Sequence, residues 1–135
     1  MITLEEWLGP YLGHPDATPE VQEKATKLLE VVNDLLLTYA EEGFAVPTNP
    51  STKSQVSGQG NGGFRPKAST IGAPLSKHKT GHAVDIYDPK GELDTWLDDF
   101  ILEEFNLYRE HPDDTKTWCH LQDVSPGSGI RTFKP

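Results

Sequence analysis

The chain has 135 residues, a length that fits one domain with its own core. Hydrophobic residues make up 35% of it and charged residues 24%, which is typical of a globular protein and argues against wholesale disorder. Twelve basic residues stand against 21 acidic residues, and the formal charge of −9 disfavours nucleic acid and anionic membranes as partners.

The N-terminal segment predicts a short helix and no export signal. Thr3 and Glu6 have the spacing of a capping box, in which each side chain accepts a hydrogen bond from the other residue's backbone N–H. The helix is expected to stop near Gly9 or Gly13. The basic start and apolar stretch of a secretory signal are missing, and no apolar run approaches the roughly 20 residues that span a bilayer. Synthesis in the cytoplasm is therefore expected.

A longer helix is predicted between Thr18 and Gly43. Thr18 is a favourable N-cap, Pro19 suits the first helical position, and Gly43 suits the C-terminal stop. Apolar residues recur between them at spacings of three and four, so one face of the helix is expected to be buried. These residues are Val21, Ala25, Leu28, Val32, Leu35, Leu36 and Tyr39.

Residues 46–75 are predicted to be irregular, because they hold four prolines and a glycine-rich run at 58–63. Short strands are conceivable at 55–57 and 64–65. The glycine run lacks the Gly-Lys-Ser/Thr ending of a phosphate-binding loop, which favours a flexible loop instead.

Two strands with a helix between them are predicted in the remainder of the chain. Residues Ala83–Tyr87 alternate in the manner of a strand, and 117–122 form the second strand. Apolar residues at helical spacing predict one helix over 94–105. Cys119 faces away from His120 and is expected to be a buried thiol; as the only cysteine it forms no intramolecular disulfide.

Two histidines and one carboxylate form a candidate metal site. His78 and Asp85 flank a turn at Gly81, and His120 projects from the second strand. If the two strands pair, Asp85 and His120 can face the same cleft. Imidazole and carboxylate donors suit zinc, and three protein ligands leave one position open, as in catalytic zinc sites. The alternative is that the three are separate polar residues on a cleft wall.

The sequence around these residues resembles a known family. The motif Ser-x-His-x-x-Gly-x-Ala-x-Asp at 76–85, followed by Trp-x-His at 118–120, is similar to that of the zinc D-alanyl-D-alanine carboxypeptidases of the VanY type. That family includes phage endolysin peptidases and shares its fold with the hedgehog signalling domain. The likeness covers residues 46–135 and includes Gly63–Pro66 and Ile71–Ala73.

The resemblance implies a role for several residues. The zinc ligands would be His78, Asp85 and His120. Arg65 matches the family's arginine, which lies near the substrate and can stabilise negative charge on the tetrahedral intermediate; a surface salt bridge is the alternative. Ser76 occupies the motif's serine position and is expected at the substrate, or as a turn hydroxyl that supports His78. Trp118 shares a strand face with His120 and is expected to line the substrate cleft.

The general base departs from the family pattern. The peptidases carry glutamate three residues before the last zinc histidine, and this chain has Thr117 there. The nearby carboxylates are Glu110, Asp113 and Asp114. Glu110 is the first candidate, because its loop could fold back onto the cleft, and Asp113 is the second. A solvated acidic loop is the alternative for all of them.

These features together predict one α+β domain over residues 1–135, with a helical part at 1–45 and a zinc-site core at 46–135. Helices would pack on one side of a small, mainly antiparallel sheet, with the zinc cleft on the exposed side. The resemblance implies a zinc metallopeptidase, expected to be monomeric, that cleaves peptidoglycan stem peptides through a zinc-activated water. Its activity would be that of an L-Ala–D-Glu endopeptidase or a D-Ala–D-Ala carboxypeptidase.

Two further hypotheses follow from the same residues. The phage members of the family imply that the enzyme leaves the cytoplasm through a holin pore and acts on the cell wall during lysis. Because Thr117 replaces the usual glutamate, the rival hypothesis is a non-catalytic zinc-binding module of a phage, with a structural or wall-recognition role. A structural domain without metal is the third.

Overall fold

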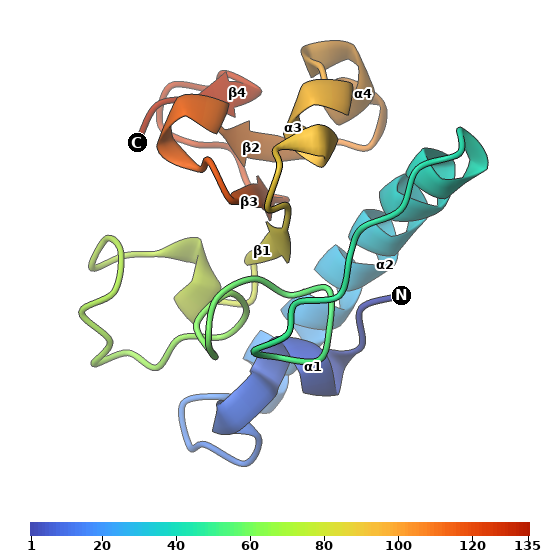
Figure 1. Ribbon diagram of the computed structural model, residues 1–135. Helices are drawn as coiled ribbons and strands as arrows, with labels where there is room; N and C mark the ends of the chain where they lie inside the picture. The colour runs from blue at the N-terminus through green and yellow to red at the C-terminus, as the bar shows by residue number, and fades with distance from the viewer.

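The computed structural model describes residues 1–135 (Figure 1). In chain order the helices and strands are α1 (Leu4–Leu8), α2 (Pro19–Glu41), β1 (Ala83–Tyr87), α3 (Glu92–Trp96), α4 (Asp99–Glu104), β2 (Tyr108–Glu110), β3 (Trp118–Gln122) and β4 (Thr132–Phe133). Short 3₁₀ turns occur at Gly9–Tyr11, Lys77–Lys79 and Pro112–Asp114. The predicted N-terminal helices and the two predicted strands are confirmed.

Both N-terminal helices begin at their predicted caps. The Thr3 hydroxyl accepts from the Glu6 N–H and the Glu6 carboxylate accepts from the Thr3 N–H, which completes the capping box of α1. The Thr18 hydroxyl accepts from the Val21 N–H at the start of α2. Val21 itself is only partly buried. The buried face of α2 consists of Ala25, Leu28, Leu29, Val32, Leu35, Leu36 and Tyr39.

The sheet has four strands in the order β1-β3-β2-β4 and is mainly antiparallel. β3 pairs antiparallel with β1 and with β2, whereas β4 runs parallel to β2. The β1–β3 register places Val84 opposite Leu121 and Asp85 opposite His120. The sequence does not predict β2 or β4, because strands of three and two residues are too short to show an alternating pattern.

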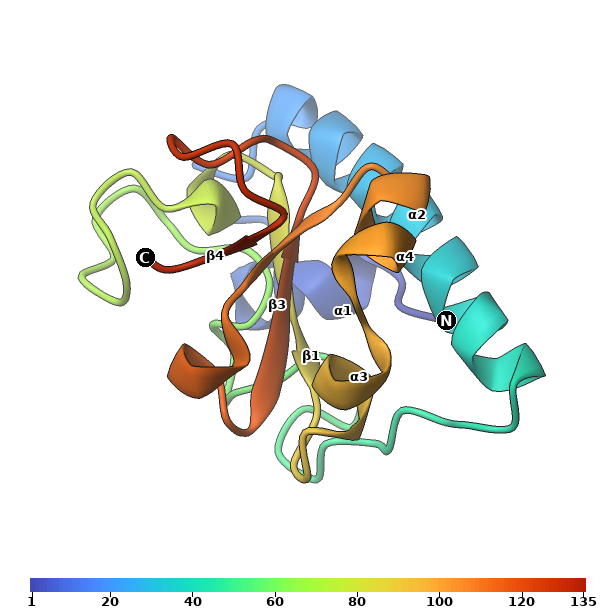
Figure 2. The same ribbon diagram turned by 90° about the horizontal axis from the view of Figure 1, so that it is seen from above.

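Helices cover one face of this sheet, and the loop that precedes β1 flanks the other (Figure 2). Figure 2 shows α2, α3 and α4 on one side of β1 and β3, with the segment before β1 on the opposite side; β4 is the edge strand of the sheet beyond β2. A core of 21 buried apolar residues joins the N-terminal helices to the sheet, and Ile86, Cys119 and Leu121 are completely buried in it. The buried thiol is confirmed. The architecture is a mixed α/β arrangement compatible with the predicted α+β class.

The single helix predicted over 94–105 is wrong, because two short helices occupy this region. α3 ends at Trp96, Leu97 is extended, and α4 begins at Asp99. The Asp98 carboxylate accepts from the Ile101 N–H and so forms a new N-cap. Apolar spacing continues across the break, and therefore periodicity alone does not reveal it.

Residues 46–75 contain no helix and no strand, as predicted. The expected strand at 55–57 is reduced to one backbone bridge between Val56 and Ile86. No strand forms at 64–65; Phe64 is instead completely buried beside Trp7. None of the helices in the structure combines the length and the apolarity that crossing a membrane requires.

Candidate metal centre

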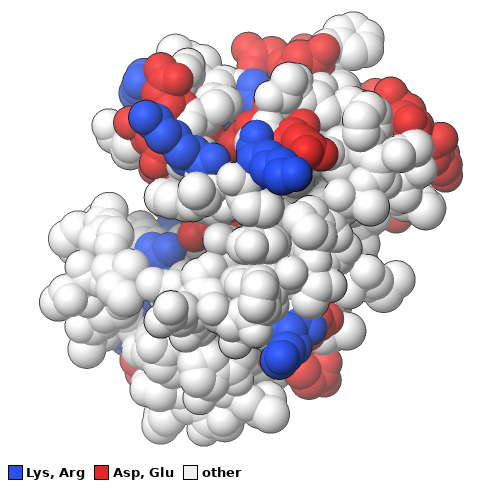
Figure 3. Space-filling model, viewed as in Figure 1, with Lys and Arg blue, Asp and Glu red and all other residues white.

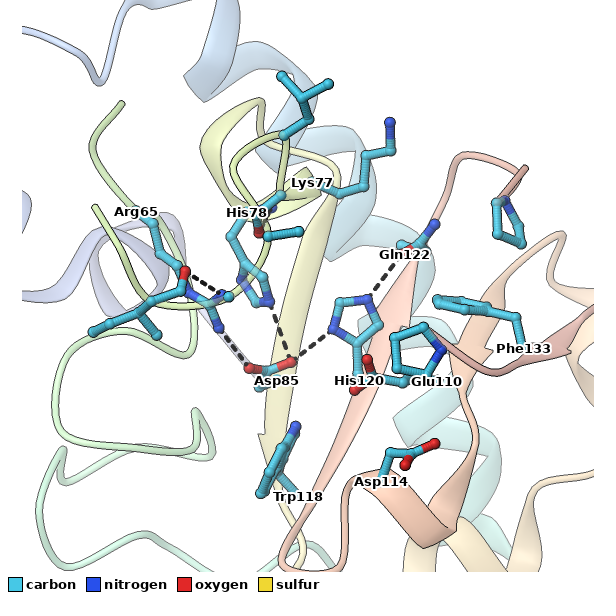
Figure 4. A pocket seen from close by; sticks show the side chains of 17 residues that line it. Arg65, Lys77, His78, Asp85, Glu110, Asp114, Trp118, His120, Gln122 and Phe133 are labelled. Carbon is cyan, nitrogen blue, oxygen red and sulfur yellow. Dashed lines mark hydrogen bonds and ion pairs between the residues drawn. The ribbon is translucent and has the colours of Figure 1, made fainter. Parts of the chain in front are cut away.

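The three predicted ligands converge on the face of the sheet that the helices leave uncovered (Figure 4). His78 lies in the 3₁₀ turn before β1, Asp85 lies in the middle of β1, and His120 lies opposite it in β3. One potential ligand atom from each side chain lies within 4.8 Å of the others. The side chains are 2%, 10% and 12% exposed, so the cluster is almost dry.

The turn at Gly81 brings His78 back over β1. Gly81 has a φ of 89°, a conformation that favours glycine. A Cβ at this position would also press on the backbone of α2 at Val21 and Ala25. The spacing between His78 and Asp85 is therefore set by a turn that packs directly against the long helix.

A backbone carbonyl fixes the orientation of His78. Its Nδ1 lies 2.7 Å from the carbonyl oxygen of Gly63, which can only accept, so Nδ1 carries the proton. In the neutral ring, Nε2 then directs its lone pair at Asp85 Oδ1, 3.3 Å away, and this buried atom has no hydrogen-bond partner. The lone pair of this buried nitrogen therefore meets no donor, and a cation between it and Asp85 Oδ1 would satisfy it.

His120 directs a nitrogen at the same carboxylate oxygen. Its Nδ1 lies 2.9 Å from Asp85 Oδ1, and its Nε2 lies 2.8 Å from Oε1 of Gln122. Figure 4 shows both imidazoles pointing at Asp85. One carboxylate oxygen therefore receives two imidazole nitrogens, an arrangement that a single shared cation would satisfy.

Burial and mutual contact shift the pKa values of the cluster. Burial lowers the pKa of His78 more than Asp85 raises it, which favours the neutral ring. Burial opposes ionisation of Asp85, but the two histidines outweigh it and hold the pKa of Asp85 well below its usual range. Burial also lowers the pKa of His120, whereas contact with Asp85 raises it by more. An ionised carboxylate beside a neutral imidazole is what metal binding requires of its ligands.

The separations between the donors suit one ion. Two donors that each lie 2.0–2.1 Å from a tetrahedral zinc ion are roughly 3.3 Å apart. The contacts of His78 and His120 with Asp85 measure 3.3 and 2.9 Å. Two imidazoles and one carboxylate also match the donors that zinc accepts. The cluster could therefore hold a metal ion and leave a fourth position for water or substrate.

Arg65 ties the cluster to the loop beside it. One Nη donates to Asp85 Oδ2 at 3.2 Å, Nε donates to the Asn61 carbonyl at 2.8 Å, and the other Nη donates to the Ile71 carbonyl at 3.3 Å. The Arg65 side chain is 11% exposed, which rules out the surface salt bridge that was the alternative. Three of its five N–H donors are used in this way, and two are left for a ligand.

The cluster lies in the wall of a cavity of about 610 Å³. Figure 3 shows a hollow between the loop that precedes β1 and the C-terminal strands, while many acidic groups gather over α4 and the end of α2. All but one of the predicted site residues line the cavity. They are Arg65, Ser76, His78, Asp85, Glu110, Trp118 and His120.

Ser76 supports His78 directly. Its hydroxyl accepts a hydrogen bond of 3.3 Å from the backbone N–H of His78 and so caps the turn that carries the imidazole. This is the supporting role that the sequence offered as the alternative for Ser76. Trp118 stands next to the cluster on the cleft face of β3, and contact of either residue with a substrate stays a prediction.

Glu110 is the candidate base that reaches the cavity. It is the last residue of β2 rather than part of a loop, and continuing the β2–β3 register by one residue places it opposite His120. Burial raises the pKa of Glu110; the charge of His120 lowers it, and the carboxylates of Asp85 and Asp114 raise it further. Glu110 is therefore a partly buried carboxylate that lies close enough to His120 and Asp85 for their charges to affect its pKa.

Asp113 is the predicted residue that does not line the cavity. Its carboxylate is 75% exposed and lies 3.6 Å from Nδ1 of His111 and 3.8 Å from Nζ of Lys134. The 3₁₀ turn after β2 directs Asp114, not Asp113, at the cavity. Thr117 is exposed just before β3 and is absent from the cavity wall.

Gln122 is the site residue that the sequence did not assign. It shares the cleft face of β3 with His120, two residues earlier, and it is 4% exposed. Its side chain lies between His120 and the carbonyl oxygen of Val124. The only signal in the sequence is the spacing of two along a strand, which places both side chains on one face.

No protein-family model, curated protein or solved structure matches this chain. The function of the site is therefore inferred from its own geometry and from the motif that its residues form.

Proposed function

We propose that this protein is a zinc-dependent peptidase that cleaves stem peptides of bacterial peptidoglycan, with a fold of the hedgehog/DD-peptidase kind. The observation that carries the proposal is the buried His78–Asp85–His120 cluster beside an open cavity. The lone pair of His78 Nε2 has no partner there, and both rings point at one carboxylate oxygen. A buried polar atom that lacks a hydrogen-bond partner lowers stability, and such atoms are common at sites that bind a ligand.

The chain's own residues divide the chemistry between them. Bound zinc would supply Lewis acidity, which polarises a carbonyl group and lowers the pKa of a water molecule. Glu110 would accept the proton of the attacking water and transfer it to the nitrogen of the leaving amine. Its raised pKa brings its proton affinity closer to the value that suits such exchange near neutral pH.

Arg65 would orient the substrate. Its guanidinium is held by Asn61, Ile71 and Asp85, so it enters the reaction without further ordering. The two N–H groups that remain suit a carboxylate of the substrate or the oxygen on which negative charge develops. Trp118 offers an apolar ring surface to the peptide beside it.

A second candidate function is a zinc-binding module without hydrolytic activity. The observation in its favour is Thr117, which occupies the position of the family's general base and is exposed. In that case Glu110 would be only a half-buried carboxylate beside the cluster. Such a module could serve in a phage particle or in recognition of the cell wall.

A digest of purified peptidoglycan separates the two functions. We expect the zinc-loaded protein to release new fragments, identified by mass spectrometry, and the Asp85→Ala variant to release none. Free stem peptides that begin with D-Glu would indicate an L-Ala–D-Glu endopeptidase, and free D-alanine would indicate a carboxypeptidase. Intact peptidoglycan after incubation with protein that demonstrably holds zinc would reject the peptidase and favour the binding module.

A further inference from the structure

We propose that Gln122 is a positioning residue that holds the proton of His120 on Nε2, so that Nδ1 is the nitrogen that binds the metal ion. The inference rests on the metal centre proposed above but concerns a residue outside the ligand set. It also predicts that the two histidines bind through different nitrogens, His78 through Nε2 and His120 through Nδ1.

The direction of the His120–Gln122 hydrogen bond follows from the other end of the amide. Either ring nitrogen of a neutral histidine can donate or accept, and the distance of 2.8 Å between Nε2 and Oε1 does not decide which. However, the Gln122 side-chain nitrogen donates to the Val124 carbonyl oxygen at 2.8 Å. Turning the amide over would place two acceptor oxygens against each other. The amide oxygen therefore faces His120, and Nε2 must donate.

This proton placement matters because the contact is buried. Gln122 is 4% exposed and the His120 side chain is 12% exposed, so little water can replace a lost partner. With the proton held on Nε2, the lone pair of Nδ1 points at Asp85 Oδ1, 2.9 Å away. The donor atom is thus aimed at the place where the lone pair of His78 Nε2 also points.

The two histidines are held by different kinds of acceptor. His78 donates to the backbone carbonyl of Gly63, which no substitution of a side chain removes. His120 donates to the side chain of Gln122, which can be replaced without touching a metal ligand. Hydrogen bonds to the outer nitrogen of metal-binding histidines fix the tautomer and the orientation of the ring. Gln122 is therefore the side chain through which this effect can be tested.

The test combines zinc affinity with nitrogen-15 NMR of the histidine rings. In Gln122→Met the acceptor is lost at similar volume, and we expect the zinc Kd to rise about 10- to 100-fold. Gln122→Glu restores the acceptor for His120 but loses the donor to the Val124 carbonyl, so it should recover only part of that loss. Gln55→Met is the control for the same substitution, since Gln55 is partly buried and lies outside the cavity wall. Its zinc Kd should equal that of the wild type.

The spectrum of the zinc-loaded wild type provides the direct readout. We expect the His120 signals to show a proton on Nε2 and a metal-bound Nδ1, and the His78 signals to show the reverse. A metal-bound Nε2 in His120, or a zinc Kd unchanged in Gln122→Met, would overturn the assignment of Gln122. If the wild type bound no zinc at all, the proposed metal centre would fail instead, which keeps the two failures distinct.

Discussion

The two faces of the β1–β3 pair differ in chemical character, although the same two strands form both. On one face Val84, Ile86, Cys119 and Leu121 are completely buried against the helical layer. On the other face Asp85 pairs with His120 and faces the cavity. The alternation of a strand therefore separates an apolar surface from a polar one within two short segments.

The two faces differ in what their side chains need: the apolar side chains need only burial, whereas the polar side chains need hydrogen-bond or charge partners. Every apolar side chain on the helix-facing side gains stability simply by leaving water. On the cavity side, the ionised carboxylate of Asp85 is largely buried, and the buried Nε2 of His78 lacks a hydrogen-bond partner. The first face accounts for folding. On the second face Arg65 contacts Asp85 Oδ2, and the proposed metal ion would lie between Asp85 Oδ1 and the histidine nitrogens.

Removing the proposed base should give the largest effect, and it should be confined to the cavity face. We expect Glu110→Gln to keep its zinc and its stability while peptidoglycan cleavage falls about 10²- to 10⁴-fold, because proton transfer is lost. Rates of fragment release measured by mass spectrometry would show this. Asp113→Asn is the matched control and should cleave normally. A drop in Asp113→Asn with normal activity in Glu110→Gln would reverse the assignment.

A substitution on the helix-facing side should have the opposite profile. Leu121→Ala leaves a cavity in the core and is expected to lower the free energy of unfolding by about 2–5 kcal/mol. Its folded fraction should still bind one zinc ion, since Leu121 and His120 point to opposite faces. Urea unfolding and zinc analysis of the same sample would test both statements. Loss of zinc from folded Leu121→Ala would show that the two faces are coupled.

Changing the pH should weaken the metal centre before it affects the core. Contact with Asp85 raises the pKa of His120 above its usual 6.5 despite the opposing effect of burial, so in the zinc-free protein this ring gains a proton first as pH falls. Zinc must then displace that proton, and its affinity should fall about tenfold per pH unit below the raised pKa. Competition titrations between about pH 8 and about pH 5.5 would measure it. A constant Kd over this range would contradict the assignment of His120 as a ligand.

The sequence predicts the parts of the molecule that local chemistry decides. Caps at Thr3 and Thr18 mark the helix starts, and the turn at Gly81 sets the distance between His78 and Asp85. These features depend on neighbours in the chain and on strong residue preferences. The position of His120 opposite Asp85 follows from the pairing of the two predicted strands.

Other features depend on contacts that are distant in the sequence. β2 is only three residues long and is defined by pairing with β3 and β4, so Glu110 looked like a loop residue. The choice between Asp113 and Asp114 depends on one 3₁₀ turn, which no periodic pattern reveals. The contact of Gln122 with His120 could be suspected from the shared strand face, but its direction required the position of Val124.

The most direct test of the metal centre is the amount of zinc that the protein keeps. Purified protein would be loaded with zinc, dialysed extensively and analysed by mass spectrometry of the metal, alongside His78→Ala and the control His82→Ala. His82 pairs with Asp123 outside the cluster, so its loss should not affect zinc. The proposed function predicts one zinc ion per chain in the wild type and in His82→Ala, and none in His78→Ala. A wild type without zinc, or His78→Ala with a full complement, would contradict the account.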